Sequence, residues 1–220
     1  VFHSQRGTID TNQKFSRLYF NAGLNWQISD NSSAGFKMER GVWLKNYFGV
    51  TMDEDILRNK ETEDHFTSVS DINSKNPNTF LTNVYYNGKM GKWGIDANID
   101  YYTQRETKDD HISETSLLGL HNVDSRTETT NHLVAARLIA DHALWSGNLK
   151  LGGEVTYVNR DNDYAISGID DISSRLSEVE EQNYALFAEY GLLVKKAGML
   201  TMGLRHEHVA FDFCDLTEAS

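Results

Sequence analysis

Residue types and patterns that mark several protein classes are scarce in this sequence. One proline among 220 residues leaves no room for a proline-rich linker. The single cysteine, Cys214, cannot form an internal disulfide, and no Cys/His grouping has the spacing of a structural zinc site. No run of about 18 apolar residues occurs, which excludes a transmembrane helix. It does not exclude transmembrane strands, whose apolar residues alternate with polar ones.

Positive charge is also scarce. The formal net charge is −11, and no run of lysine or arginine alternates with aromatic residues, so we expect no nucleic-acid partner. There is no Gly-x-Ser-x-Gly elbow, no phosphate-binding glycine-rich loop and no His-Glu-x-x-His helix. We therefore expect neither an enzyme nor a cofactor.

A period of two dominates what is present. In residues 18–28 one apolar and one polar face alternate, with Leu18, Phe20, Ala22, Leu24, Trp26 and Ile28 on the apolar side. The pattern recurs and predicts an all-β, antiparallel up-and-down meander of about eight strands. The expected strands span residues 14–28, 33–51, 79–90, 93–105, 128–144, 148–160, 180–195 and 198–213.

The connections between these strands alternate in length. Short turns are expected near residues 30, 90, 147 and 197, and long polar loops at residues 53–78, 105–127 and 161–180. Transmembrane barrels have short turns on one side of the membrane and long loops on the other. The asymmetry therefore predicts a transmembrane β-barrel with its long loops facing outward to capture a ligand.

Two groups of side chains support that prediction. Trp26, Trp93 and Trp145 each lie near a short turn, where amphipathic indoles are expected at the level of the lipid headgroups. Nine charged residues occupy the polar phase of the strands and are expected to line a wet lumen: Lys37, Glu39, Asp96, Asp100, Arg137, Glu154, Glu189, Arg205 and Glu207.

Two segments carry a family resemblance. Gly203-Leu204-Arg205-His206-Glu207-His208 follows an Ala188-Glu189-Tyr190 strand and a Lys-Lys-Ala-Gly turn, and Ala22-Gly23-Leu24-Asn25-Trp26 leads through Ser29-Asp30 into the next hairpin. This pattern, from about Lys14 to Phe213, resembles the barrels of TonB-dependent receptors. More narrowly, it resembles the outer membrane protein β-barrel family related to them.

The resemblance implies a location in the outer membrane of a gram-negative bacterium and a role in solute binding and uptake. It also implies a lipid bilayer around the barrel, a plug inside a barrel of about 22 strands and an energy-coupling complex. Residues 1–220 are expected to form a single β-barrel region without a plug, so the resemblance implies an internal or C-terminal fragment. Alternatively, the eight strands close by themselves, because eight is a viable number for a barrel.

A second hypothesis is a soluble or surface-attached β-barrel or β-sandwich that binds ligands in an apolar interior. Its discriminator is the position of the tryptophans, because a soluble interior gives no cause for three of them to flank short turns. Folding as a monomer without detergent would favour this alternative.

Candidate metal ligands are weak. His206 and His208 lie on the same side of a strand, but in the apolar phase of Leu204, and we expect no metal there. Acidic residues between Asp53 and His65 offer oxygen ligands for Ca²⁺ without the spacing of an EF-hand. Arg40 interrupts an apolar face, which predicts either a position near a rim or a register shift.

Overall fold

The computed structural model describes residues 3–169, 172–194 and 198–217, most of which lie in strands. Within them, no helix is long and apolar enough to cross a membrane. The strands are β1 (His3–Ser29), β2 (Ser32–Arg58), β3 (Glu61–Met90), β4 (Trp93–Ser116), β5 (Gly119–Leu144), β6 (Gly147–Ser167), β7 (Arg175–Val194) and β8 (Gly198–Asp215).

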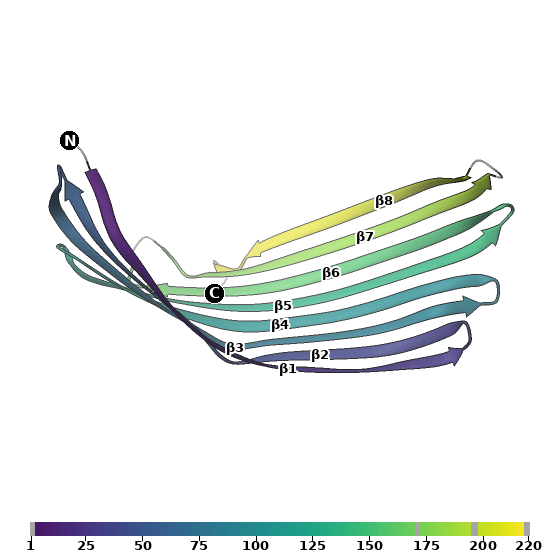
Figure 1. Ribbon diagram of the computed structural model, residues 1–220, viewed down its shortest axis with the longest axis horizontal. Coiled ribbons are helices and arrows are strands. Elements are labelled where there is room, and N and C mark those ends of the chain that lie inside the picture. The colour runs from purple at the N-terminus through teal and green to yellow at the C-terminus, as the bar shows by residue number, and fades with distance from the viewer. Residues whose placement is uncertain (1–2, 170–171, 195–197, 218–220) are drawn as a thin grey trace.

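Each strand pairs antiparallel with the next, in the order β1 to β8. This confirms the predicted all-β meander. Figure 1 shows one curved sheet with β1 and β8 at opposite edges and with the β1–β2, β3–β4 and β5–β6 turns at one end. Within the described residues β1 does not pair with β8, so the eight strands form an open sheet.

The sheet is a single layer without a packed core. Among the described residues, leaving glycines aside, the only buried hydrophobic residues are Val123 and Ala185. Leu18, Trp26 and Leu186 are instead 60%, 64% and 68% exposed. The closed apolar interior that a soluble binding protein requires is therefore not formed by these residues.

The predicted long loops are wrong, because the strands extend through most of them. β2 and β3 continue to a turn at Asn59–Lys60, and β4 and β5 to a turn at Leu117–Leu118. The third predicted loop is shortened at both ends, because β6 continues to Ser167 and β7 begins at Arg175. About 9–11 residues per strand suffice to cross a bilayer, whereas β3 has 30. Beyond that length both faces meet water, so the apolar alternation disappears although the backbone ladder continues. We call this end of the sheet, which carries the turns at Asn59–Lys60 and Leu117–Leu118, the extension; it begins at two bulges that are described below.

Strand boundaries shift for the same reason. β1 begins at His3 rather than near residue 14, β5 begins at Gly119 rather than near residue 128, and β7 begins at Arg175. At the other end of the sheet the boundaries agree closely with those expected. The predicted turn at Lys195–Ala197 lies outside the described residues.

Two bulges mark the transition from the apolar belt to the extension. Ser16 and Arg17 of β1 pair with Lys45 and Trp43, which leaves Leu44 of β2 without a partner in that ladder. In β3 the register against β4 shifts between Lys75 and Asn78, where the chain's one proline lies. Proline lacks the N–H that a regular ladder position needs, so a bulge accommodates it.

Candidate functional site

The pairing register decides which side chains share a face of the sheet. Residues directly opposite each other in an antiparallel pair point to the same side, and the register runs unbroken from Lys37 through Asn83 to Asp100. By this rule one side, which we call the polar face, carries all nine predicted lumen residues: Lys37, Glu39, Asp96, Asp100, Arg137, Glu154, Glu189, Arg205 and Glu207. That the polar face lines a watery passage stays a prediction.

Charges on the polar face are paired with opposite charges on neighbouring strands. Arg137 Nη2 lies 3.6 Å from Asp96 Oδ1, and Lys150 Nζ lies 3.8 Å from Glu189 Oε1. These side chains are 43–47% exposed, so each pair adds little stability. Their effect is that neighbouring charges on the polar face balance each other.

Arg205 makes the most extensive of these contacts. Its Nη2 lies 2.9 Å from Glu154 Oε2 on β6, and its Nε donates to Glu207 at 2.5 Å. The contact to β6 passes across the whole of β7. This is possible because Ala185, directly opposite both Glu154 and Glu207, is small and only 3% exposed. The guanidinium also lies 5.8 Å from the centre of the Phe187 ring.

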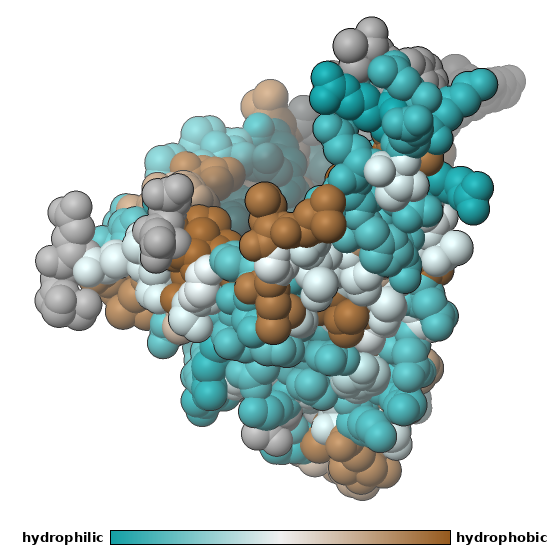
Figure 2. All heavy atoms as spheres, turned by 90° about the vertical axis from the view of Figure 1, so that its left-hand side faces the viewer, coloured by the Kyte–Doolittle hydropathy of each residue, from teal (hydrophilic) through white to brown (hydrophobic). Residues whose placement is uncertain are grey.

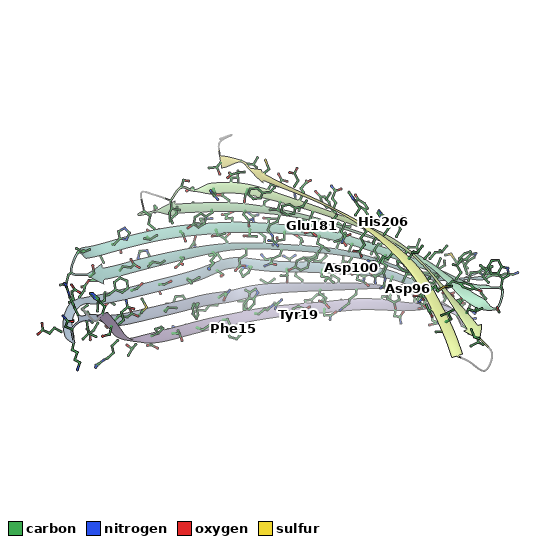
Figure 3. The ribbon with its side chains drawn as sticks, turned by 90° about the horizontal axis from the view of Figure 1, so that it is seen from above. Phe15, Tyr19, Asp96, Asp100, Glu181 and His206 are labelled. Atoms are coloured by element: carbon green, nitrogen blue, oxygen red, sulfur yellow. The ribbon has the colours of Figure 1, made fainter. Side chains whose placement is uncertain are left out.

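Amides continue the polar network near the middle of the sheet. Asn83 Nδ2 on β3 donates to Asn98 at 2.8 Å and to Asp100 at 2.7 Å, both on β4. Figure 3 shows Asp96 and Asp100 along β4. A solute that passes along this face therefore meets both donors and acceptors.

One aromatic cluster on the polar face was missed by the sequence reasoning. Arg17 lies 5.2 Å from the ring centres of both Tyr19 and Trp43, and Phe15 meets Trp43 edge-on at 6.1 Å. We call these four residues the edge cluster; Figure 3 marks Phe15 and Tyr19 on β1. The signal was the shared phase: Arg17, Tyr19 and Trp43 fall in the polar alternation of their strands.

The opposite side, the apolar face, presents large side chains outward. Leu24, Leu138 and Leu204 are 72%, 54% and 84% exposed. A shallow, open groove of about 680 Å³ crosses this face where Gly153 has no side chain, between Leu138 and Leu186. Such an uncovered apolar surface is what hydrocarbon would cover.

The three predicted tryptophans lie at the end of the sheet that carries the short turns. Trp26 is near the end of β1, Trp93 begins β4, and Trp145 occupies the β5–β6 turn, 89% exposed. The ring of Trp93 stacks on His142 at 4.8 Å, and that of Trp145 meets Tyr190 at 6.3 Å. Their role as interfacial anchors stays a prediction.

His206, His208 and Arg40 lie on the apolar face. His206 is opposite Leu186, and the described residues contain no group of three or more potential metal-ligating side chains. Arg40 is opposite Phe20 and Phe80 in an unbroken stretch of register. A register shift at Arg40 is therefore excluded, which leaves the expected position toward a rim, just before the bulge.

The extension carries two histidine–aspartate contacts. His65 Nδ1 lies 3.0 Å from Asp55 and its Nε2 3.2 Å from Asp53. The hydrogen bond to Asp55 and the negative charge of Asp53 raise the pKa of His65. A hydrogen bond to Asp124 likewise raises the pKa of His111. Figure 2 looks onto this end of the molecule and shows mostly hydrophilic side chains with separate hydrophobic patches.

Comparison with known proteins agrees with this geometry. A sequence profile described as the outer membrane protein beta-barrel family matches residues 88–219, more than half of the chain. No curated protein matches the chain. The match covers the end of β3 and all of β4 to β8, which include seven of the nine charged residues of the polar face.

Proposed function

Because the chain belongs to the outer membrane protein beta-barrel family, we propose that it forms part of the wall of a TonB-dependent receptor-like transporter. The chain is an outer-membrane protein in contact with the lipid bilayer. In the proposed function it has no catalytic role. Its polar face lines the path of a solute, and the extension contributes to capture on the outer side of the membrane.

The observation that carries this proposal is the two-sided character of a single-layer sheet. Leu186 is 68% exposed on one side, whereas Glu189, three residues further along β7, is paired with Lys150 on the other. A water-soluble protein would have to cover the first side with a second layer. Hydrocarbon on that side and water on the other satisfies both faces without one.

The open edges support the wall of a larger barrel. β1 and β8 each have one neighbour among the described strands, so one side of each backbone ladder is unpaired. Unpaired strand edges do not occur in contact with lipid. We therefore propose that further strands pair with both edges, and that a plug and an energy-coupling complex are the remaining partners.

Labelling of single cysteines tests the orientation of the two faces. In a variant whose Cys214 is replaced by serine, cysteines are placed at Leu186 or at Glu189. We expect a lipid-soluble maleimide to label the first position and a water-soluble one to label the second. Equal labelling of both positions from water would contradict the bilayer assignment.

Cross-linking tests whether the edges meet each other. One cysteine at Asn21 of β1 is combined in turn with a cysteine at Gly203, Arg205, Glu207 or Val209 of β8, again without Cys214. In the larger barrel no pair forms an intrachain disulfide, because other strands lie between them. A high-yield disulfide for one pair would show that the eight strands close by themselves.

A further inference from the structure

We infer that Arg17, held by the rings of the edge cluster, binds the carboxylate of a solute that also carries a flat apolar ring. The inference rests on the proposed function, because it names the class of solute that this wall recognises. It starts from an arginine for which the described residues provide no carboxylate within ion-pair distance.

Arg17 differs from two other arginines of the polar face, because both of those form ion pairs. Arg137 and Arg205 both have a carboxylate within 4 Å. Among the described residues, no carboxylate lies that close to Arg17 and no hydrogen bond engages its N–H groups; its contacts are the two aromatic rings. Its donors are therefore available to a ligand, and a planar guanidinium matches a carboxylate with two parallel hydrogen bonds.

The carboxylate that contacts Tyr19 of the edge cluster is engaged by other groups. Glu39 accepts a hydrogen bond from the Tyr19 hydroxyl and forms an ion pair with Lys37. Its charge is thereby balanced by Lys37. Arg17 is then the uncompensated charge of this small region, in a chain whose net charge is −11.

The Arg17 guanidinium lies over a glycine of the neighbouring strand, Gly41 of β2. A Cβ added at Gly41 would lie 2.6 Å from Arg17 Nη2 and 2.6 Å from Thr79 Oγ1, so both side chains lean over the bare backbone of β2. The two rings near the guanidinium and the bare glycine backbone beside it restrict where the guanidinium can lie. A positioned donor loses less entropy on binding than a free one.

The rings also define what accompanies the carboxylate. Phe15 is 64% exposed and meets Trp43 edge-on, so an apolar surface lies beside the guanidinium. An exposed phenylalanine beside a guanidinium offers a flat ring a stacking partner. Charge and ring together point to an aromatic carboxylate.

Four small probes separate the parts of this inference. Benzoate has both the carboxylate and the ring, acetate lacks the ring, benzamide lacks the charge, and inorganic phosphate is an anion of another class. Binding is measured by ligand-observed NMR on the protein extracted from membranes in detergent. We expect benzoate to bind saturably. The affinity of acetate, benzamide and phosphate should each be lower by about tenfold or more.

Variants assign the binding to Arg17. R17Q and G41A are expected to weaken benzoate binding about tenfold, the first by removing the charge and the second by displacing it. R17K keeps the positive charge but lacks the two parallel donors of the guanidinium, so its affinity for benzoate should lie between those of R17Q and the unmodified protein. R40Q is the matched control, because it removes an arginine of β2 from the apolar face, where Arg40 is opposite Phe20, and it should bind benzoate as the unmodified protein does.

The contrary outcomes are equally definite. If the unmodified protein shows no saturable benzoate binding, or binds benzamide or phosphate equally well, the inference is overturned. It is overturned too if R17Q, confirmed as folded, binds benzoate as well as the unmodified protein does, or if R17K and G41A both do. Labelling at Leu186 and Glu189 is independent of benzoate, so failure of this inference is distinguishable from failure of the proposed function.

Discussion

The Tyr85 hydroxyl on β3 donates a hydrogen bond of 2.7 Å to Asn25 Oδ1 on β1, across the strand that separates them. The ring lies over Gly35 of β2, where an added Cβ would come within 2.3 Å of it. Arg17 likewise lies over Gly41 of the neighbouring strand β2, and the ring of Phe187 lies over Gly152 of β6. Glycine thus makes room on the polar face for a long side chain to lie across a neighbouring strand, and at Gly35 this connects two strands that are not neighbours.

Gly35→Ala should break the contact between Tyr85 and Asn25. The new methyl group forces the ring off the strand, and overpacking of this kind costs about 1–3 kcal/mol. Urea unfolding in detergent measures the loss. Tyr85→Phe is the control: it keeps the ring and removes only the hydrogen bond, at about 0.5–1.5 kcal/mol. A Gly35→Ala variant as stable as the unmodified protein would contradict this account.

Ala185→Leu should separate Arg205 from Glu154. Ala185 is 3% exposed beneath that ion pair, so a leucine has no space without moving the pair aside. The expected loss is about 1–3 kcal/mol of unfolding free energy, measured by the same denaturation. Ala188→Leu on the exposed apolar face of β7 is the matched control and should change stability little. Equal effects of the two substitutions would argue against close packing at Ala185.

The cost in stability of an arginine on the apolar face should depend on its depth in the bilayer, being large at position 24 and small at position 40. Leu24→Arg places a charge in the middle of the apolar stretch of β1, which costs about 2–4 kcal/mol in a bilayer. Arg40 lies just before the bulge, so Arg40→Leu should change stability by only about 0–1 kcal/mol. Folding equilibria in lipid vesicles compare the two. A large gain from Arg40→Leu would place Arg40 deep in the hydrocarbon.

The tryptophans should differ in their access to lipid. With the other tryptophans replaced by phenylalanine, a variant that retains Trp26 reports from the apolar face, and one that retains Trp43 reports from the polar face. Lipids brominated close to the headgroup should quench the fluorescence of Trp26 and leave that of Trp43 nearly unchanged. Comparable quenching of both would mean that the sheet does not separate lipid from water.

The tip of the β2–β3 hairpin should loosen as the pH rises. The pKa of His65 is raised by the hydrogen bond to Asp55 and by the charge of Asp53, so its contribution to stability is complete below the unfolded pKa of about 6.5. That contribution is lost as the pH rises through the higher folded pKa. Hydrogen exchange of residues 53–67, corrected for intrinsic rates, should show less protection at high pH. In H65Q the dependence should disappear; its persistence would assign it to another group.

Much of the fold follows from local pattern. The alternation around Leu24 or Leu186 places each side chain relative to its own strand, which is why the meander and the shared side of the nine charged residues could be predicted. The strand extensions could not. Residues such as Thr67 and Ser113 lie beyond the apolar belt, and a strand with water on both faces has no alternation to detect.

The sequence by itself determined that the chain is a series of strands with one apolar and one polar side, because that information repeats every two residues. Only the tertiary structure decided how far the strands extend, that the sheet is open at β1 and β8, and where Leu44 leaves the ladder. It alone decided that Arg17 lies over Gly41, with no carboxylate of the described part of the chain within ion-pair distance. These features depend on which residues of separate strands come to face each other, and pairing between strands leaves no trace in the period of either one.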